Sequence, residues 1–188
     1  MLKKELRSIY LDRRKQLSST EIDALSKSIC ERIISHFAPG PGDSMHLFLS
    51  SSKFNEVDTA YLVDYCHKNK VDVFVPKIVD GKMISVALRP DTELTAGVFG
   101  IREPESNTDV KRAHYDYIVT PLLYADSSGA RVGYGKGYYD SFFSTLDESS
   151  LRIGVGFFPP LEIITDVHPH DVPLHYLVTA SEILSFIG

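Results

Sequence analysis

Apolar residues recur at helical spacing along the first part of the chain and gather into short blocks after it. The spacing over residues 3–17 predicts one helix. A second predicted helix begins at a capping box, Ser18-x-x-Glu21, and carries one apolar stripe as far as Phe37. Pro39-Gly40-Pro41-Gly42 follows, a run typical of a helix end.

The remaining residues alternate between strand-like and helix-like patterns. Pro76 and Pro121 are expected to stop the strands that precede them. The segment 89–115 is rich in Pro, Gly and polar residues, and we expect a long loop with short elements. The predicted strands are 45–49, 71–75, 83–88, 117–120, 152–157 and 176–180, and the further helices are 58–68 and the segment from the Gly-rich loop to about Leu146.

This alternation favours the α/β class. We expect a three-layer α/β/α fold, Rossmann-like, with a largely parallel central sheet and a single domain over residues 1–188. Ligands of such sheets bind beyond the carboxyl ends of the strands. The loops after Leu49, Val75, Thr120 and Phe157 should therefore lie near one another.

One of these loops carries the most informative motif, Arg131-Val132-Gly133-Tyr134-Gly135-Lys136-Gly137-Tyr138-Tyr139-Asp140. Glycines allow backbone N–H groups to converge on an anion, and Lys136 is placed to neutralise phosphate oxygens. The helix predicted after Gly137 would direct its N-terminus at the same anion. The spacing fits neither a Walker A loop nor a dinucleotide fingerprint. A turn that only joins a strand to a helix is the alternative.

Three further groups of polar residues could bind a ligand, and each also has a simpler structural explanation. Lys3 and Arg7 lie one helical turn apart and could grip a triphosphate, or form an exposed basic face. Glu56 could accept hydrogen bonds from a pterin or purine edge, or cap the next helix. Asp171, in a loop that also holds two histidines, could share a Mg²⁺ ion with Asp140, or be solvated.

Composition narrows the classes of function. The net charge of −5, without a basic tail, argues against a nucleic-acid partner. No apolar run approaches the roughly 20 residues needed to cross a bilayer, and we do not expect the first residues to act as a signal peptide. Cys30 and Cys66 are expected to be buried free thiols. We therefore expect a cytoplasmic protein without a membrane partner, and we also expect a monomer.

Taken in order, several segments resemble one family over essentially the whole chain. The segments are Lys3-x-x-Leu6-Arg7, Phe48-Leu49-Ser50, Glu56-Val57-Asp58-Thr59, Val75-Pro76-Lys77, Gly100-Ile101-Arg102-Glu103-Pro104, the Gly-rich motif, and His170-Asp171-Val172-Pro173. The Gly-rich motif is the most specific of them. Together they resemble 5-formyltetrahydrofolate cyclo-ligase, also called 5,10-methenyltetrahydrofolate synthetase.

The resemblance implies an ATP- and Mg²⁺-dependent reaction that converts 5-formyltetrahydrofolate to 5,10-methenyltetrahydrofolate. By position, it implies nucleotide contacts from Lys3, Lys4, Glu5, Leu6, Arg7, Arg131, Val132, Gly133, Tyr134, Gly135, Lys136, Gly137, Tyr138 and Tyr139. It implies folate contacts from Leu49, Glu56, Tyr134, Gly135, Lys136, Gly137 and Tyr138. It implies Asp140 and Asp171 as Mg²⁺ ligands, and Lys136, Tyr138 and Arg131 as catalytic residues.

Two other functions are compatible with a phosphate-binding loop. A sensor would bind a sugar phosphate or nucleotide without releasing phosphate. A sugar-phosphate isomerase would need a carboxylate base and no ATP. The paired tyrosines and the basic first helix favour the ligase.

Overall fold

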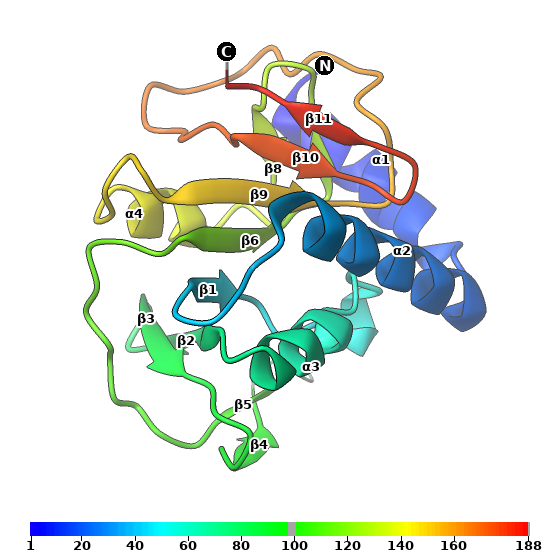
Figure 1. Cartoon of the computed structure of the whole chain (residues 1–188). Helices are drawn as coiled ribbons and strands as arrows, with labels where there is room; N and C mark the ends of the chain where they lie inside the picture. The colour runs from blue at the N-terminus through cyan, green and yellow to red at the C-terminus, as the bar shows by residue number, and fades with distance from the viewer. Residues whose placement is uncertain (98–100, 188) are drawn as a thin grey trace.

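The computed structural model describes residues 1–97 and 101–187, which form a central sheet with helices on both faces (Figure 1). The helices are α1 (Lys3–Lys15), α2 (Ser19–Phe37), α3 (Ala60–Lys68) and α4 (Tyr138–Phe143), with a short 3-10 turn η1 (Ser52–Phe54). The strands are β1 (Ser44–Leu47), β2 (Asp72–Val79), β3 (Lys82–Ala87), β4 (Leu94–Ala96), β5 (Arg102–Pro104), β6 (Tyr117–Pro121), β7 (Tyr124–Ala125), β8 (Arg131–Val132), β9 (Leu151–Val155), β10 (Tyr176–Val178) and β11 (Ile183–Ser185).

The central sheet has seven strands in the order β11-β10-β9-β6-β1-β2-β3. The five inner strands pair in parallel, and only the edge strands β3 and β11 run antiparallel. The predicted α/β fold with a largely parallel sheet is therefore confirmed. Because β1, β6 and β9 are parallel neighbours, the loops that follow them leave the same edge of the sheet.

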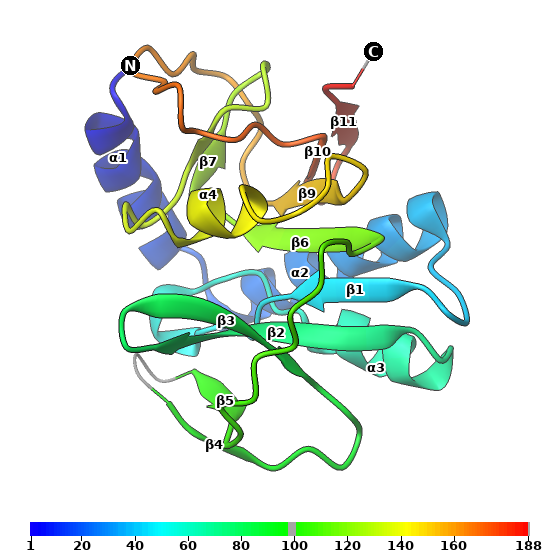
Figure 2. The same cartoon turned by 90° about the vertical axis from the view of Figure 1, so that its left-hand side faces the viewer.

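Side chains alternate between the two faces of the sheet, as strand geometry requires. On one face, Met45 and Leu47 pack with Ile29 of α2 and Leu62 of α3 in the largest hydrophobic cluster. On the other face, Phe74 and Ile118 pack with Phe143 of α4 in a smaller cluster. Figure 2 shows α4 on the side of the sheet that faces the viewer, opposite α2 and α3.

Helix α1 packs outside the sheet, against the β7–β8 hairpin. Leu6 and Tyr10, one helical turn apart, are buried there with Val132, and the Tyr10 and Tyr124 rings stack with centroids 4.3 Å apart. The packing brings the first residues of the chain beside the residues that follow β8. Two segments far apart in sequence, both singled out above, thus become neighbours.

Pro76 does not stop its strand, contrary to the prediction, and β2 continues to Val79. The β1–β2 pairing ends at Phe74, so Pro76 has no strand on its β1 side. On its other side it faces Ser85, whose N–H donates to Asp109 and whose C=O accepts from Val110 N. Pro76 and Ser85 are therefore a pair that exchanges no ladder hydrogen bonds, and the missing N–H costs nothing.

Other boundaries also differ from the prediction. Helix α4 ends at Phe143, three residues before Leu146, and the strand pair β7–β8 and the edge strand β11 were not predicted. Cys30 and Cys66 are buried free thiols, as expected. No helix of residues 1–97 and 101–187 combines the length and apolarity that crossing a membrane requires. Gly100 of the Gly100–Pro104 motif lies outside the described residues.

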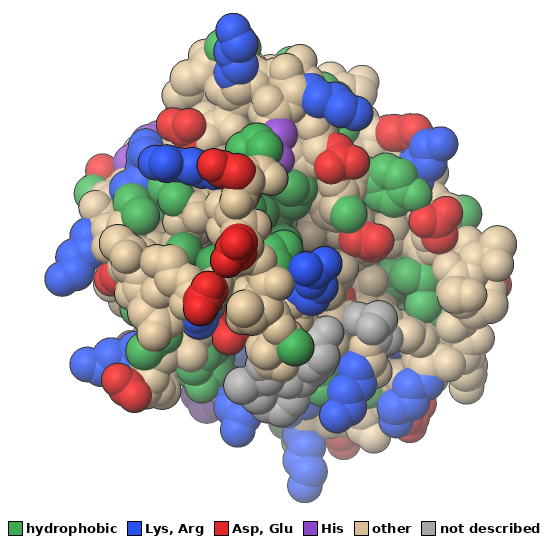
Figure 3. Space-filling view, turned by 90° about the horizontal axis from the view of Figure 1, so that it is seen from below, with side chains coloured by type: hydrophobic (Ala, Val, Ile, Leu, Met, Phe, Trp, Pro, Cys, Tyr) green, Lys and Arg blue, Asp and Glu red, His purple; other side chains and the backbone are tan. Residues whose placement is uncertain are grey.

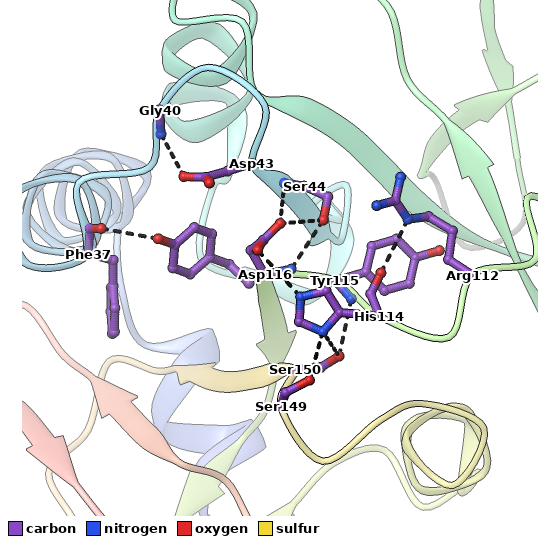
Figure 4. Close-up of polar contacts among 11 residues, drawn as sticks. Phe37, Gly40, Asp43, Ser44, Arg112, His114, Tyr115, Asp116, Ser149 and Ser150 are labelled. Atoms are coloured by element: carbon purple, nitrogen blue, oxygen red, sulfur yellow. Dashed lines mark hydrogen bonds and ion pairs between the residues drawn. The ribbon is translucent and has the colours of Figure 1, made fainter.

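A polar cluster joins the amino ends of β1 and β6 (Figure 4). Asp116 Oδ2 accepts hydrogen bonds from Ser44 N at 2.8 Å and Ser44 Oγ at 2.7 Å, and Asp116 N donates to Ser44 Oγ. His114 lies between Asp116 and Ser149, with Ser149 Oγ 3.0 Å from its Nδ1. Although the residue types are those of a catalytic triad, Asp116 is held by Ser44 and its contact to His114 is long, at 3.4 Å. The cluster fastens two strands at the edge opposite the loops considered next.

Candidate active site

The Gly-rich loop connects β8 to α4. Gly135 and Gly137 have φ of +85° and +69°, and Gly137 is the residue from which α4 begins. A Cβ at position 135 would lie 3.2 Å from Cζ of Arg7, so a side chain there would be both strained and crowded. Positive φ therefore favours glycine at positions 135 and 137, and at position 135 the Arg7 side chain would also have to shift to admit a Cβ.

The basic residues of α1 contact the loop and the segment that precedes β10. Arg7 Nε donates to Gly133 O at 2.9 Å. Lys3 Nζ forms an ion pair with Asp171, and Lys3 N donates to Asp166 Oδ1 at 2.7 Å. Lys3 and Arg7 are therefore built into the site. Lys4 is exposed, and Glu5 accepts from Leu2 N as a helix cap.

The two predicted Mg²⁺ ligands are both paired with cations. Asp140 Oδ1 accepts from Arg131 Nη2 at 2.7 Å and from Val172 N at 3.0 Å. Asp171 Oδ2 accepts from Lys3 Nζ and from His168 N. Partial burial alone would raise the pKa of Asp171, but the hydrogen bonds from Lys3 and His168 N outweigh it and the pKa is lowered. No three His, Cys, Asp or Glu side chains within the described residues gather as a metal cage.

Glu56 reaches the loop through a tyrosine. Its side chain is 7% exposed; Oε2 accepts from Ser51 N at 2.8 Å and Oε1 from the Tyr134 hydroxyl at 2.9 Å. Arg14 Nη1 in turn donates to the Tyr134 hydroxyl at 3.0 Å. Burial raises the pKa of Glu56, while the hydrogen bonds and the charge of Arg14 oppose that shift. The residue predicted to hold a pterin is thus joined directly to the residues predicted to hold phosphates.

Leu49 and Glu56 line one cleft of about 580 Å³. Its volume is typical of a site for a small organic ligand. The other lining residues come from α2, from the segment before α3 and the first residue of α3, and from the β4–β5 hairpin. They are Ser19, Ile22, Asp23, Ser50, Ser51, Asn55, Asp58, Thr59, Ala60, Leu94 and Arg102. Asp58 also caps α3, because its Oδ1 accepts from Ala60 N at 3.0 Å.

The other predicted site residues differ in how exposed they are and in what they contact. Lys136 is exposed on the loop and Tyr138 is half-buried at the start of α4. The hydroxyl of Tyr139 is buried and has no hydrogen-bond partner among the described residues, so Tyr139 is the member of the pair that packs under the loop. The side chains of Leu6 and Val132 are wholly buried in the cluster beneath α1.

Arg14 was not singled out from the sequence. It is 3% exposed, and besides Tyr134 it donates to Leu122 O, directly after β6. A signal was present, since Leu6, Tyr10 and Arg14 follow one another at intervals of four, which places Arg14 on the buried stripe of α1. A charged residue on such a stripe needs partners, and here the partners belong to the site.

These features define an α/β protein whose basic Gly-rich loop adjoins an acid-containing cleft at the carboxyl edge of a parallel sheet. Residues 1–180 match the model of the 5-formyltetrahydrofolate cyclo-ligase family. The chain belongs to the 5-formyltetrahydrofolate cyclo-ligase family.

Individual relatives agree over nearly the whole length. A probable 5-formyltetrahydrofolate cyclo-ligase of Caenorhabditis elegans is 26% identical over 98% of this chain and 96% of its own. The 5-formyltetrahydrofolate cyclo-ligase of Mycoplasma genitalium is 26% identical over 94% of this chain and 96% of its own. Among solved structures, the 5,10-methenyltetrahydrofolate synthetase of Aquifex aeolicus is similar with a TM-score of 0.84 and 28% identity, over all of this chain and 94% of that one.

Proposed function

We propose that this chain converts 5-formyltetrahydrofolate to 5,10-methenyltetrahydrofolate with ATP as the phosphate donor. Family membership over residues 1–180 and relatives that carry this name support the proposal. In the proposed site, Lys136 and the loop amides bind the ATP phosphates with Lys3 and Arg7, while Glu56 and Leu49 hold the pterin end of the folate.

One observation carries the proposal: the hydrogen bond between Tyr134 and Glu56. It joins the loop suited to phosphates to the carboxylate suited to a pterin. The amino-pyrimidine edge of a pterin offers N–H donors, and a carboxylate accepts two of them side by side. An enzyme that transfers phosphate to a folate needs these two groups close together, and the Tyr134–Glu56 contact supports that arrangement.

The reaction requires alignment and charge stabilisation, and no protein nucleophile. The formyl oxygen attacks the γ-phosphorus of ATP, and ADP leaves. N10 of the folate then attacks the formyl carbon, and this new bond closes the ring. N10 loses its proton, and the bond from the carbon to the phosphate oxygen breaks, so that inorganic phosphate leaves. Lys136 and the backbone N–H groups of the loop offset the charge on the transferred phosphoryl group. Tyr138 and Arg131 complete the proposed catalytic set.

Asp140 and Asp171 are the residues that would hold Mg²⁺. Their chemistry fits, because Mg²⁺ beside a nucleotide is usually bound by one or two carboxylates together with phosphate oxygens and water. The contacts described above engage Oδ1 of Asp140 and Oδ2 of Asp171, so each carboxylate has a second oxygen to offer. When bound, the ion would neutralise phosphate charge, and Arg131 and Lys3 would keep the two carboxylates oriented.

The proposal includes the setting in which the enzyme acts. The seven-stranded sheet contains strands from β1 to β11, which supports a single domain. The net charge of −5 supports small-molecule substrates over nucleic acid. The proposed enzyme is also monomeric and cytoplasmic. Light scattering after gel filtration checks the monomer, and a dimer mass would reject it.

The direct test mixes the protein with ATP, Mg²⁺ and 5-formyltetrahydrofolate and follows methenyl absorbance and ADP together. The proposal expects both products in equal amounts, and no reaction when ATP is omitted or Mg²⁺ is chelated. A sensor would bind ligand without releasing ADP, and an isomerase would not need ATP. Absence of the methenyl product under all conditions would reject the proposed function.

A further inference from the structure

The two walls of the cleft that holds Leu49 and Glu56 differ in charge. One wall, from α2 and the segment before α3, carries Asp23 and Asp58. The opposite wall comes from the β4–β5 hairpin and carries Leu94 and Arg102. Within the described part of the chain, Arg102 is the only basic side chain that lines this cleft.

The acidic residues of the cleft already have partners. Glu56 accepts from Ser51 N and Tyr134, Asp58 accepts from Ser50 Oγ at 3.1 Å, and Asp23 accepts from the Tyr61 hydroxyl at 2.8 Å. Among the described residues, the one hydrogen bond of the Arg102 guanidinium goes to a backbone carbonyl, Leu94 O, at 3.2 Å. None of the ion pairs among residues 1–97 and 101–187 includes Arg102.

The hairpin directs Arg102 toward the cleft. Arg102 pairs with Ala96 across the hairpin, and Leu94 lies two residues before Ala96 on the same face. Leu94 packs against the main hydrophobic cluster and lines the cleft together with Arg102. The face of the hairpin that carries Arg102 is therefore the face turned to the body of the molecule.

We propose that Arg102 binds the carboxylate tail of the folate, an inference that rests on the proposed function. With the pterin end at buried Glu56, the opposite end of the ligand must leave by the rim, and that end of a folate is a glutamate. The acidic wall repels carboxylates, whereas a guanidinium forms paired, charge-assisted hydrogen bonds with one. Figure 3 shows the side of the molecule with β4 and β5, where acidic and basic side chains are interspersed. Binding of the carboxylate tail therefore depends on the contact with Arg102 and not on the charge of the whole surface.

The test compares R102Q with the wild type on two ligands: 5-formyltetrahydrofolate and a truncated analogue in which the glutamate is replaced by an uncharged primary amide, so that no carboxylate remains. Calorimetry gives the dissociation constants, and steady-state kinetics gives KM and kcat. R89Q, which removes an exposed arginine outside the cleft lining, is the matched control, and R102K tests whether charge alone suffices.

We expect R102Q to weaken binding of the intact folate about tenfold, with kcat and the KM for ATP unchanged. Binding of the truncated compound should not change, R89Q should behave as wild type, and R102K should recover part of the loss. Equal affinity of R102Q and wild type for the intact folate, or an equal loss with both ligands, would overturn the inference. Because calorimetry measures binding directly, it tests the role of Arg102 even if the protein makes no methenyl product. Absence of that product would reject the proposed function and would leave the binding result unaffected.

Discussion

Lys136 stands on the Gly-rich loop with its side chain in solvent, so its removal should leave packing intact. We expect Lys136→Ala to lower kcat by roughly 10²–10³-fold, because a positioned cation that offsets charge in the transition state contributes on that scale. Steady-state kinetics and circular dichroism measure the effect and the fold. Lys82→Ala, at an exposed position of the β2–β3 hairpin, is the control; near-normal turnover of Lys136→Ala would remove Lys136 from the mechanism.

Tyr134 joins Arg14 to Glu56, and its hydroxyl can be deleted with little change of shape. In Tyr134→Phe, Glu56 loses one of the hydrogen bonds that oppose the effect of burial, so its pKa should rise further. Since only the ionised carboxylate accepts two pterin N–H bonds, folate binding should weaken as the pH falls, with the midpoint at higher pH than in the wild type. The pH dependence of the folate KM measures this midpoint.

The same experiment contains its own control. The KM for ATP should respond little to Tyr134→Phe, because Arg7 and Gly133 keep their contact. A folate KM that rises equally at every pH would indicate that Tyr134 acts through shape alone, and would contradict the role given to the Glu56 charge.

At the scale of elements, the sequence predicted those helices and strands that depend on a local pattern of residues. The capping box at Ser18 forms as expected, with Ser18 N donating to Glu21 Oε2 at 2.8 Å, and the apolar blocks become the inner strands. Pro76 was misjudged because its tolerance depends on where the β1–β2 pairing ends, which no local pattern contains. The short β7–β8 and β11 pairings depend likewise on partners far along the chain.

The candidate site likewise contains residues that the sequence predicts and contacts that it does not predict. The Gly-rich loop could be recognised from its own residues, and Glu56 from its place after a strand. The Tyr134–Glu56–Arg14 contacts could not, because α1, the loop before α3 and the loop before α4 meet only in the folded chain. Arg102 lies in a segment expected to be mostly loop, and only the hairpin register turns it toward the cleft.

Asp116 offers a test of an element contact remote from the site. In Asp116→Ala, β1 and β6 lose the hydrogen bonds from Ser44, and we expect the free energy of unfolding to fall by about 1–2 kcal/mol, since the carboxylate is partly exposed. Urea denaturation measures this change. Asp64→Ala, at an exposed position of α3, should have almost no effect. A large loss of kcat in a folded Asp116→Ala protein would contradict the separation of this cluster from the active site.

At the scale of the whole molecule, one buried histidine makes the free energy of unfolding depend on pH. His46 lies in β1 on the α4 face of the sheet, its ring 4.5 Å from that of Phe142, and neither ring nitrogen has a hydrogen-bond partner among the described residues. Burial lowers the pKa of His46 to about 3, from an ordinary value of 6.5. Between these values the unfolded chain binds a proton that the folded chain does not. Stability should therefore fall as the pH is lowered through this range.

His46→Leu should remove this dependence. From pH 7 to pH 5, the wild type should lose about 2 kcal/mol more of its free energy of unfolding than His46→Leu, since each pH unit below the unfolded pKa costs roughly 1.4 kcal/mol. Urea denaturation at both pH values measures the difference. His170→Gln, at an exposed position, should keep the wild-type slope. Parallel losses in wild type and His46→Leu would mean that the folded protein accepts the proton at His46, which would require the sheet and α4 to separate there without unfolding the rest of the chain.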